Sequence, residues 1–79
     1  MRMLEDQTGQ RWSVDVLAAS YGVCYLVFSA AGAGSVRKAP LAADSRLEGA
    51  RVLAQMTETA LLAALAESTD FAEHSALGF

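Results

Sequence analysis

Hydrophobic and polar residues alternate along residues 11–19, where Trp12, Val14 and Val16 are apolar positions. A period of two puts such side chains on one face of a β-strand. A shorter apolar-rich stretch at residues 1–5 precedes it, and the intervening Asp-Gln-Thr-Gly-Gln sequence is typical of a turn. The two stretches therefore predict a first β-hairpin.

A second alternating run follows Ser20-Tyr21-Gly22, which has the form of a three-residue hairpin loop ending in glycine. This loop pairs Val14 with Phe28, whereas a two-residue loop would pair Asp15 with Phe28. Residues directly opposite each other share one side of a sheet, so the apolar pattern favours the three-residue loop. The predicted core face consists of Trp12, Val14, Val16, Cys24, Leu26 and Phe28.

Glycine-rich residues 30–35 predict a flexible loop, and residues 35–41 predict a fourth strand. Pro40 has no backbone donor and fits a strand end or a sheet edge. Arg37 and Lys38 fit an exposed edge, because charge there discourages pairing with other chains.

From residue 42 the apolar spacing becomes helical. Ser45-Arg46-Leu47-Glu48 matches a capping box, with Asp44 or Ser45 as N-cap, and Thr57 is the expected N-cap of a second helix. Gly49 inside the first helix indicates close packing there. The predicted apolar stripes are Leu47, Ala50, Leu53 and Ala54 in the first helix, and Leu61, Leu62, Ala64 and Leu65 in the second.

The predicted fold is α+β: a four-stranded antiparallel β-meander over residues 1–41, then two α-helices over residues 42–68 packed on one face (ββββαα). We predict a single domain over residues 1–79, in which residues 69–79 form a short helical turn or a flexible tail. The reverse of the sheet would carry Ser13, Asp15, Leu17, Val23, Tyr25 and Val27.

Composition adds to this picture. Hydrophobic residues make up 53% of the 79 residues and charged residues 19%, and the formal net charge is −3. A small domain rich in apolar residues often covers part of its surface with a second copy or a partner. Nucleic-acid binding rests on clustered cations, so we do not expect it from an acidic chain whose basic residues are dispersed.

The chain offers little support for a membrane or secreted protein. Residues 16–36 contain no charge, but glycines and serines interrupt them and their apolar residues alternate as in strands. No apolar segment follows a basic start, and one cysteine cannot form an internal disulfide. These features predict a cytoplasmic protein without a transmembrane helix.

Catalytic and metal-binding motifs are weak. Cys24 and His74 are the one possible thiol–imidazole pair, but Cys24 lies in mid-strand on the core face and His74 in a polar tail. One Cys and one His cannot complete a structural zinc site. The glycines of residues 30–35 match no phosphate-binding fingerprint. We predict no catalytic, metal or cofactor residues.

These observations favour a non-enzymatic protein-interaction module that self-associates or docks on a protein partner through the exposed sheet face. Aromatic side chains beside cations are the best candidates for recognition. The candidate surface comprises Leu17, Tyr21, Val23, Tyr25, Val27, Arg37 and Lys38. The alternative is a small-molecule-binding or enzyme accessory domain with a site between helices and sheet, where Cys24 or His74 would act.

Overall fold

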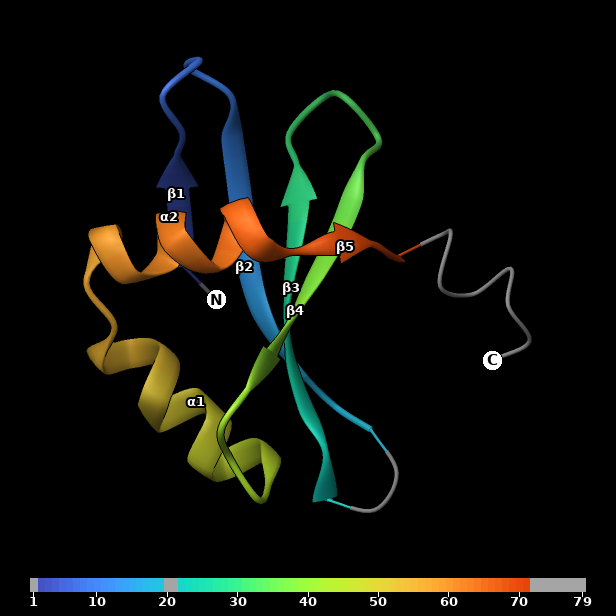
Figure 1. Cartoon of the computed structure of the whole chain (residues 1–79), viewed down its shortest axis with the longest axis vertical. Coiled ribbons are helices and arrows are strands. Elements are labelled where there is room, and N and C mark those ends of the chain that lie inside the picture. The colour runs from blue at the N-terminus through green and yellow to red at the C-terminus, as the bar shows by residue number, and fades with distance from the viewer. Residues whose placement is uncertain (1, 20–21, 72–79) are drawn as a thin grey trace.

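The computed structural model describes residues 2–19 and 22–71. Within them the elements are β1 (Arg2–Glu5), β2 (Arg11–Ala18), β3 (Cys24–Ala30), β4 (Val36–Leu41), α1 (Arg46–Gln55), α2 (Glu58–Glu67) and β5 (Thr69–Asp70). Figure 1 shows the helices following the four-stranded meander, with α2 crossing in front of β1 and β2. The ββββαα prediction is confirmed.

The strands follow the order β1-β2-β3-β4-β5, and every neighbouring pair is antiparallel. The β2–β3 register is the predicted one: Val14 lies opposite Phe28, Val16 opposite Leu26 and Ala18 opposite Cys24. Beyond the strands, the Ala19 N–H donates to the Val23 carbonyl at 2.7 Å, and Gly22 has a φ of 72°. Glycine adopts such an angle without steric cost, as the predicted loop requires. Ser20 and Tyr21 lie outside the described residues.

The hydrophobic core lies between the sheet and the helices. Val14 and Phe28 are fully buried, and Leu61 of α2 is equally enclosed. Leu62, Ala64 and Leu65 pack against the same cluster, which confirms the predicted stripe of α2. The predicted core face is confirmed in full, since Trp12, Val14, Val16, Cys24, Leu26 and Phe28 are all buried.

Both helices begin at hydroxyl caps. The Ser45 Oγ accepts a hydrogen bond from the Glu48 N–H at 3.2 Å, so Ser45 is the N-cap of α1. The Thr57 Oγ1 accepts one from the Ala60 N–H at 3.1 Å, as predicted for α2. Each cap satisfies an amide that the first helical turn leaves without an intrahelical acceptor.

The predicted apolar stripe of α1 is wrong except at Leu53. The Leu47 residue is 74% exposed, and Ala50 and Ala54 are also exposed. Gly49 and Leu53, one turn apart, are the buried residues of α1. A Cβ at Gly49 would lie 2.7 Å from Val16 Cγ1. The helix therefore meets the sheet at Gly49, where it has no side chain, and places Leu53 in the core one turn later, which confirms close packing at Gly49.

The end of the described chain corrects another prediction. Thr69 and Asp70 form β5, which pairs with Lys38 and Arg37 of β4, so the predicted helical turn or tail does not begin at residue 69; Phe71 has helical backbone. Arg37 and Lys38 therefore do not lie at an open sheet edge, because β5 covers the edge beside them. Residues 72–79 lie outside the described residues.

Two arginines from the sheet bind the C-terminal ends of the helices, neither of which has a basic residue in its own last turn. The Arg2 guanidinium donates to the Leu53 carbonyl at 3.0 Å and to the Met56 carbonyl. The Arg37 guanidinium donates to the Ser68 Oγ at 2.7 Å and the Ser68 carbonyl at 2.5 Å. A cation at the negative end of the helix dipole is favourable, so these contacts fix the helices to β1 and β4.

Candidate functional site

The strand register defines a surface on the side of the sheet away from the helices. Asp15, Val27 and Lys38 lie in one row across β2, β3 and β4, and Leu17, Tyr25 and Pro40 lie in the next. Residues in such rows point to the same side, and they alternate along each strand with the buried residues. We call these six residues the reverse face: Asp15, Leu17, Tyr25, Val27, Lys38 and Pro40.

Apolar and aromatic groups at the reverse face remain partly open to solvent. Leu17 is 40% exposed, and Tyr25 and Val27 are half-buried. The Lys38 Nζ lies 4.4 Å from the centroid of the Tyr25 ring and 5.7 Å from that of Phe71. Both distances allow attraction between the ammonium and the negative faces of the rings. The reverse face thus combines aliphatic surface, an aromatic ring and a held cation.

The structure brings together Leu17, Tyr25, Val27 and Lys38 of the predicted surface. Val23, which is 44% exposed, precedes β3, and its carbonyl accepts a hydrogen bond from the Ala19 N–H. Tyr21 falls outside the described residues.

Arg37 does not belong to this surface. It lies opposite Phe28, whose side chain is in the core, so it is on the helix side of the sheet. Its guanidinium is engaged with Ser68 at the end of α2. Adjacent residues of a strand point to opposite faces, and this alternation separates Arg37 from Lys38. The prediction that Arg37 lies on the same candidate surface as Lys38 is therefore wrong.

Sequence reasoning missed Pro40 and Phe71. Pro40 is exposed and lies opposite Tyr25, and extending the predicted register into the fourth strand would have placed it there. Phe71 is near Lys38 only because β5 returns the chain to β4. No local pattern in the sequence indicates such a two-residue strand.

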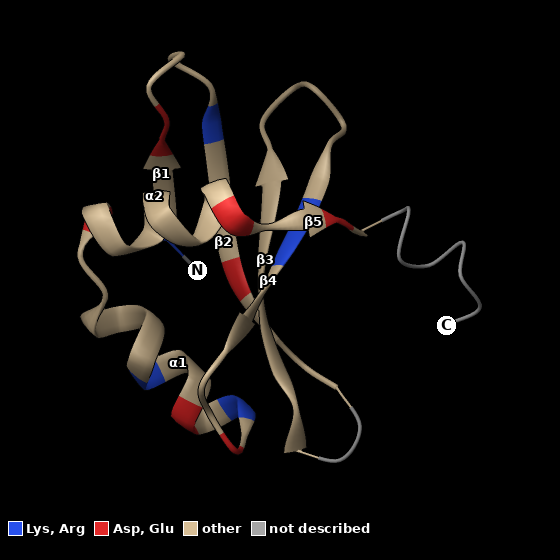
Figure 2. Ribbon diagram, in the orientation of Figure 1, with Lys and Arg blue, Asp and Glu red and all other residues tan. Residues whose placement is uncertain are grey.

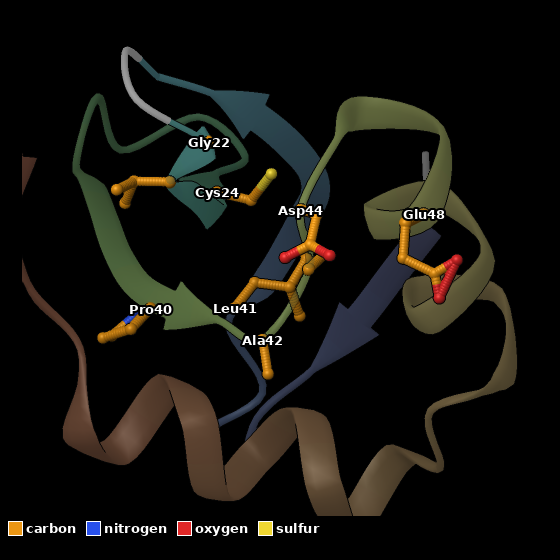
Figure 3. Close-up of a pocket in the computed structure, with 9 residues that line it drawn as sticks. Gly22, Cys24, Pro40, Leu41, Ala42, Asp44 and Glu48 are labelled. Carbon is orange, nitrogen blue, oxygen red and sulfur yellow. The ribbon is translucent and has the colours of Figure 1, made fainter.

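A hollow of about 580 Å³ opens where β3 begins and β4 ends, facing the start of α1 (Figure 3). It is lined by Gly22, Val23, Cys24, Pro40, Leu41, Ala42, Ala43, Asp44 and Glu48. Cys24 is 2% exposed, so its thiol is largely covered. The lining contains two carboxylates and, among the described residues, no basic side chain. Cysteine is activated by neighbouring cations, and this lining supplies none.

Asp6 organises the turn between β1 and β2. Its carboxylate accepts hydrogen bonds from the Thr8 hydroxyl at 2.6 Å and the Trp12 indole N–H at 3.0 Å, and also from the Thr8 and Gln10 amides. Hydrogen bonds from Thr8 and Trp12 lower the pKa of Asp6 from 3.8 to about 2. The carboxylate stays ionised at neutral pH and holds the turn against the core tryptophan.

Charge is dispersed over the described part of the chain. Figure 2 shows the basic residues spread over β1, β2, β4 and α1, with acidic residues on several of the same elements. Within residues 2–19 and 22–71, no group of three His, Cys, Asp or Glu side chains is placed to hold a metal ion. Neither helix in this part of the chain has the length and apolarity needed to cross a bilayer.

Comparisons with protein-family models, with curated proteins and with solved structures return no match to this chain.

Proposed function

We propose that this protein is a small non-enzymatic interaction module that docks on protein through the reverse face. One observation carries the proposal: partly exposed Leu17 lies beside Tyr25, whose ring is held under Lys38, on the side of the sheet away from the helices. Tyrosine offers a large and rigid contact area at low entropic cost, and aromatic residues are enriched at interfaces.

The fold makes this side of the sheet available. The core lies between the sheet and one layer of helices, which cover only one face of the sheet. A protein partner bound to the other face would cover it as a second layer. Apolar content of 53% with 19% charged residues fits a chain that places part of its surface in an interface.

The hollow beside Cys24 is the basis of a second candidate function, the binding of a small molecule. It is a shallow hollow of about 580 Å³ that is largely open to solvent, and it lies between α1 and the sheet, where the alternative from the sequence would have its site. The covered thiol and the absence of a cation in the described lining make it the weaker candidate.

The proposal is tested by affinity capture from the native host, with mass spectrometry of the bound proteins. Tyr25→Glu places a charge at the centre of the reverse face and should abolish capture. Leu47→Glu, at a residue that is 74% exposed on α1, is the matched control and should capture the same proteins as wild type. Circular dichroism checks that both variants fold. Equal capture by all three proteins would contradict the proposed function.

A further inference from the structure

We infer that the partner of the reverse face is a second copy of this chain, packed sheet against sheet. This inference rests on the proposed function and adds the identity of the partner. It starts from the row Asp15–Val27–Lys38, in which an acid on β2 and a base on β4 flank the central strand β3. Neighbouring strands are about 4.8 Å apart, so the Cα atoms of Asp15 and Lys38 lie at similar distances on either side of Val27, and the Lys38 ammonium extends from there over the Tyr25 ring.

The charges in this row complement each other about one particular twofold axis. This axis runs parallel to β3 and passes in front of Val27, midway between the two stacked sheets. A half-turn about it places β2 of one copy over β4 of the other. Asp15 then faces Lys38 of the second copy, and the same pair forms again on the other side of the axis. Two sheets stacked in this way lie about 10 Å apart with their strands nearly aligned, a gap that a lysine and an aspartate can bridge.

The next row is compatible with the same axis. Leu17 meets Pro40 of the second copy. Tyr25 meets its own equivalent once the Lys38 ammonium turns from the Tyr25 ring, where it lies 4.4 Å from the centroid, to Asp15 of the second copy. A half-turn about an axis perpendicular to the strands instead places Asp15 over Asp15 and Lys38 over Lys38. Like charges facing each other across an interface are costly. The charge pattern therefore selects the first arrangement.

The size of the face indicates how tight the dimer is. Strands β2, β3 and β4 over six or seven residues cover roughly 200–300 Å² of sheet, from their spacing and rise, and the rims add to this. Interfaces of well under about 1,200 Å² in total are typical of weak, reversible association. We expect a dimer that forms at micromolar concentration or above.

Charge reversal tests the pairing directly by sedimentation equilibrium of the purified full chain. Asp15→Lys alone and Lys38→Glu alone each place like charges across the axis, and each should weaken self-association at least tenfold. An equal mixture of the two variants restores both opposite-charge pairs and should form a heterodimer with wild-type affinity. Glu48→Lys, an exposed residue of α1, changes charge away from the face and should associate like wild type.

The Asp15 carboxylate also accepts a hydrogen bond from the Val16 N–H at 2.9 Å, so Asp15→Lys removes a contact within the chain as well as one across the interface. The double variant Asp15→Lys/Lys38→Glu separates these two effects. It restores both pairs in the homodimer and should associate again. The inference is overturned if wild type stays monomeric up to millimolar concentration, or if the mixture does not associate. Wild type could instead be monomeric while, in the affinity capture described above, Leu47→Glu still binds the host proteins and Tyr25→Glu does not. In that case only the self-pairing is wrong, and the proposed function stands.

Discussion

Gly49 is a point where α1 packs closely against the sheet, and Gly49→Ala probes this contact with a single methyl group. The added Cβ would lie 2.7 Å from Val16 Cγ1 and 3.3 Å from Leu41 Cδ2. Val16 is buried in β2, and its β-branched side chain has little rotamer freedom. The methyl group must therefore displace the helix or the strand.

Two opposing terms set the magnitude. Replacing glycine by alanine in a helix interior raises the free energy of unfolding by about 1 kcal/mol, because alanine has the higher helix propensity. Overpacking a closely packed core costs about 1–3 kcal/mol. We expect Gly49→Ala to lower the free energy of unfolding by about 1 kcal/mol, against the direction of helix propensity. In a Val16→Ala background the clashing methyl groups are gone, and the same substitution should stabilise by up to about 1 kcal/mol.

Urea denaturation followed by circular dichroism measures all four members of this cycle. Ala50→Gly, at an exposed position of α1, is the control for propensity and should cost about 1 kcal/mol. A Gly49→Ala protein more stable than wild type would refute the close approach of α1 to β2. So would an unchanged effect in the Val16→Ala background.

Three further predictions concern the contacts around the core. Arg37→Met should lower the free energy of unfolding, measured by urea denaturation, by about 1.5–3 kcal/mol, because it removes charge-assisted hydrogen bonds to Ser68. The exposed control Arg46→Met should change it by under about 0.5 kcal/mol. Equal effects of the two substitutions would contradict the role of Arg37. The lowered pKa of Asp6 contributes stability that is present above its ordinary value of 3.8 and lost as the pH falls toward about 2. Wild type should therefore lose more stability than Asp6→Asn across that window, and parallel pH profiles would refute this. Cys24 in native protein should react with a thiol reagent only as fast as the structure opens, and a rate near that of a free thiol would show that it is accessible.

The sheet could be predicted because one local rule determines most of it. Alternation fixed which residues of β2 and β3 face the core, and the loop ending in Gly22 left one register that buried Val14 with Phe28. The same alternation located Leu17, Tyr25 and Val27 on the reverse face. Pairing geometry carries this information from one strand to the next.

The errors lie where packing between elements overrides local pattern. In α1 three residues of the predicted apolar stripe, Leu47 among them, are exposed and only Leu53 is buried, because the helix docks through Gly49, the position with no side chain. Strand β5 is two residues long and forms where the Arg37–Ser68 contacts hold the chain beside β4. The assignment of Arg37 to the recognition surface is wrong for a local reason, because alternation along β4 places it on the helix side, opposite Phe28; only its contacts with Ser68 depend on a residue distant in sequence.

A dilution series of amide spectra by nuclear magnetic resonance tests the central claim most directly, because it identifies the face of the wild-type chain that meets protein. If the reverse face pairs with a second copy, amide shifts should depend on concentration at Leu17, Tyr25, Val27 and their neighbours in β2, β3 and β4. The amides of α1 and α2 should stay constant. Shifts that do not change with concentration would contradict the self-pairing, and changes confined to the helices would contradict the reverse face as the surface that meets protein.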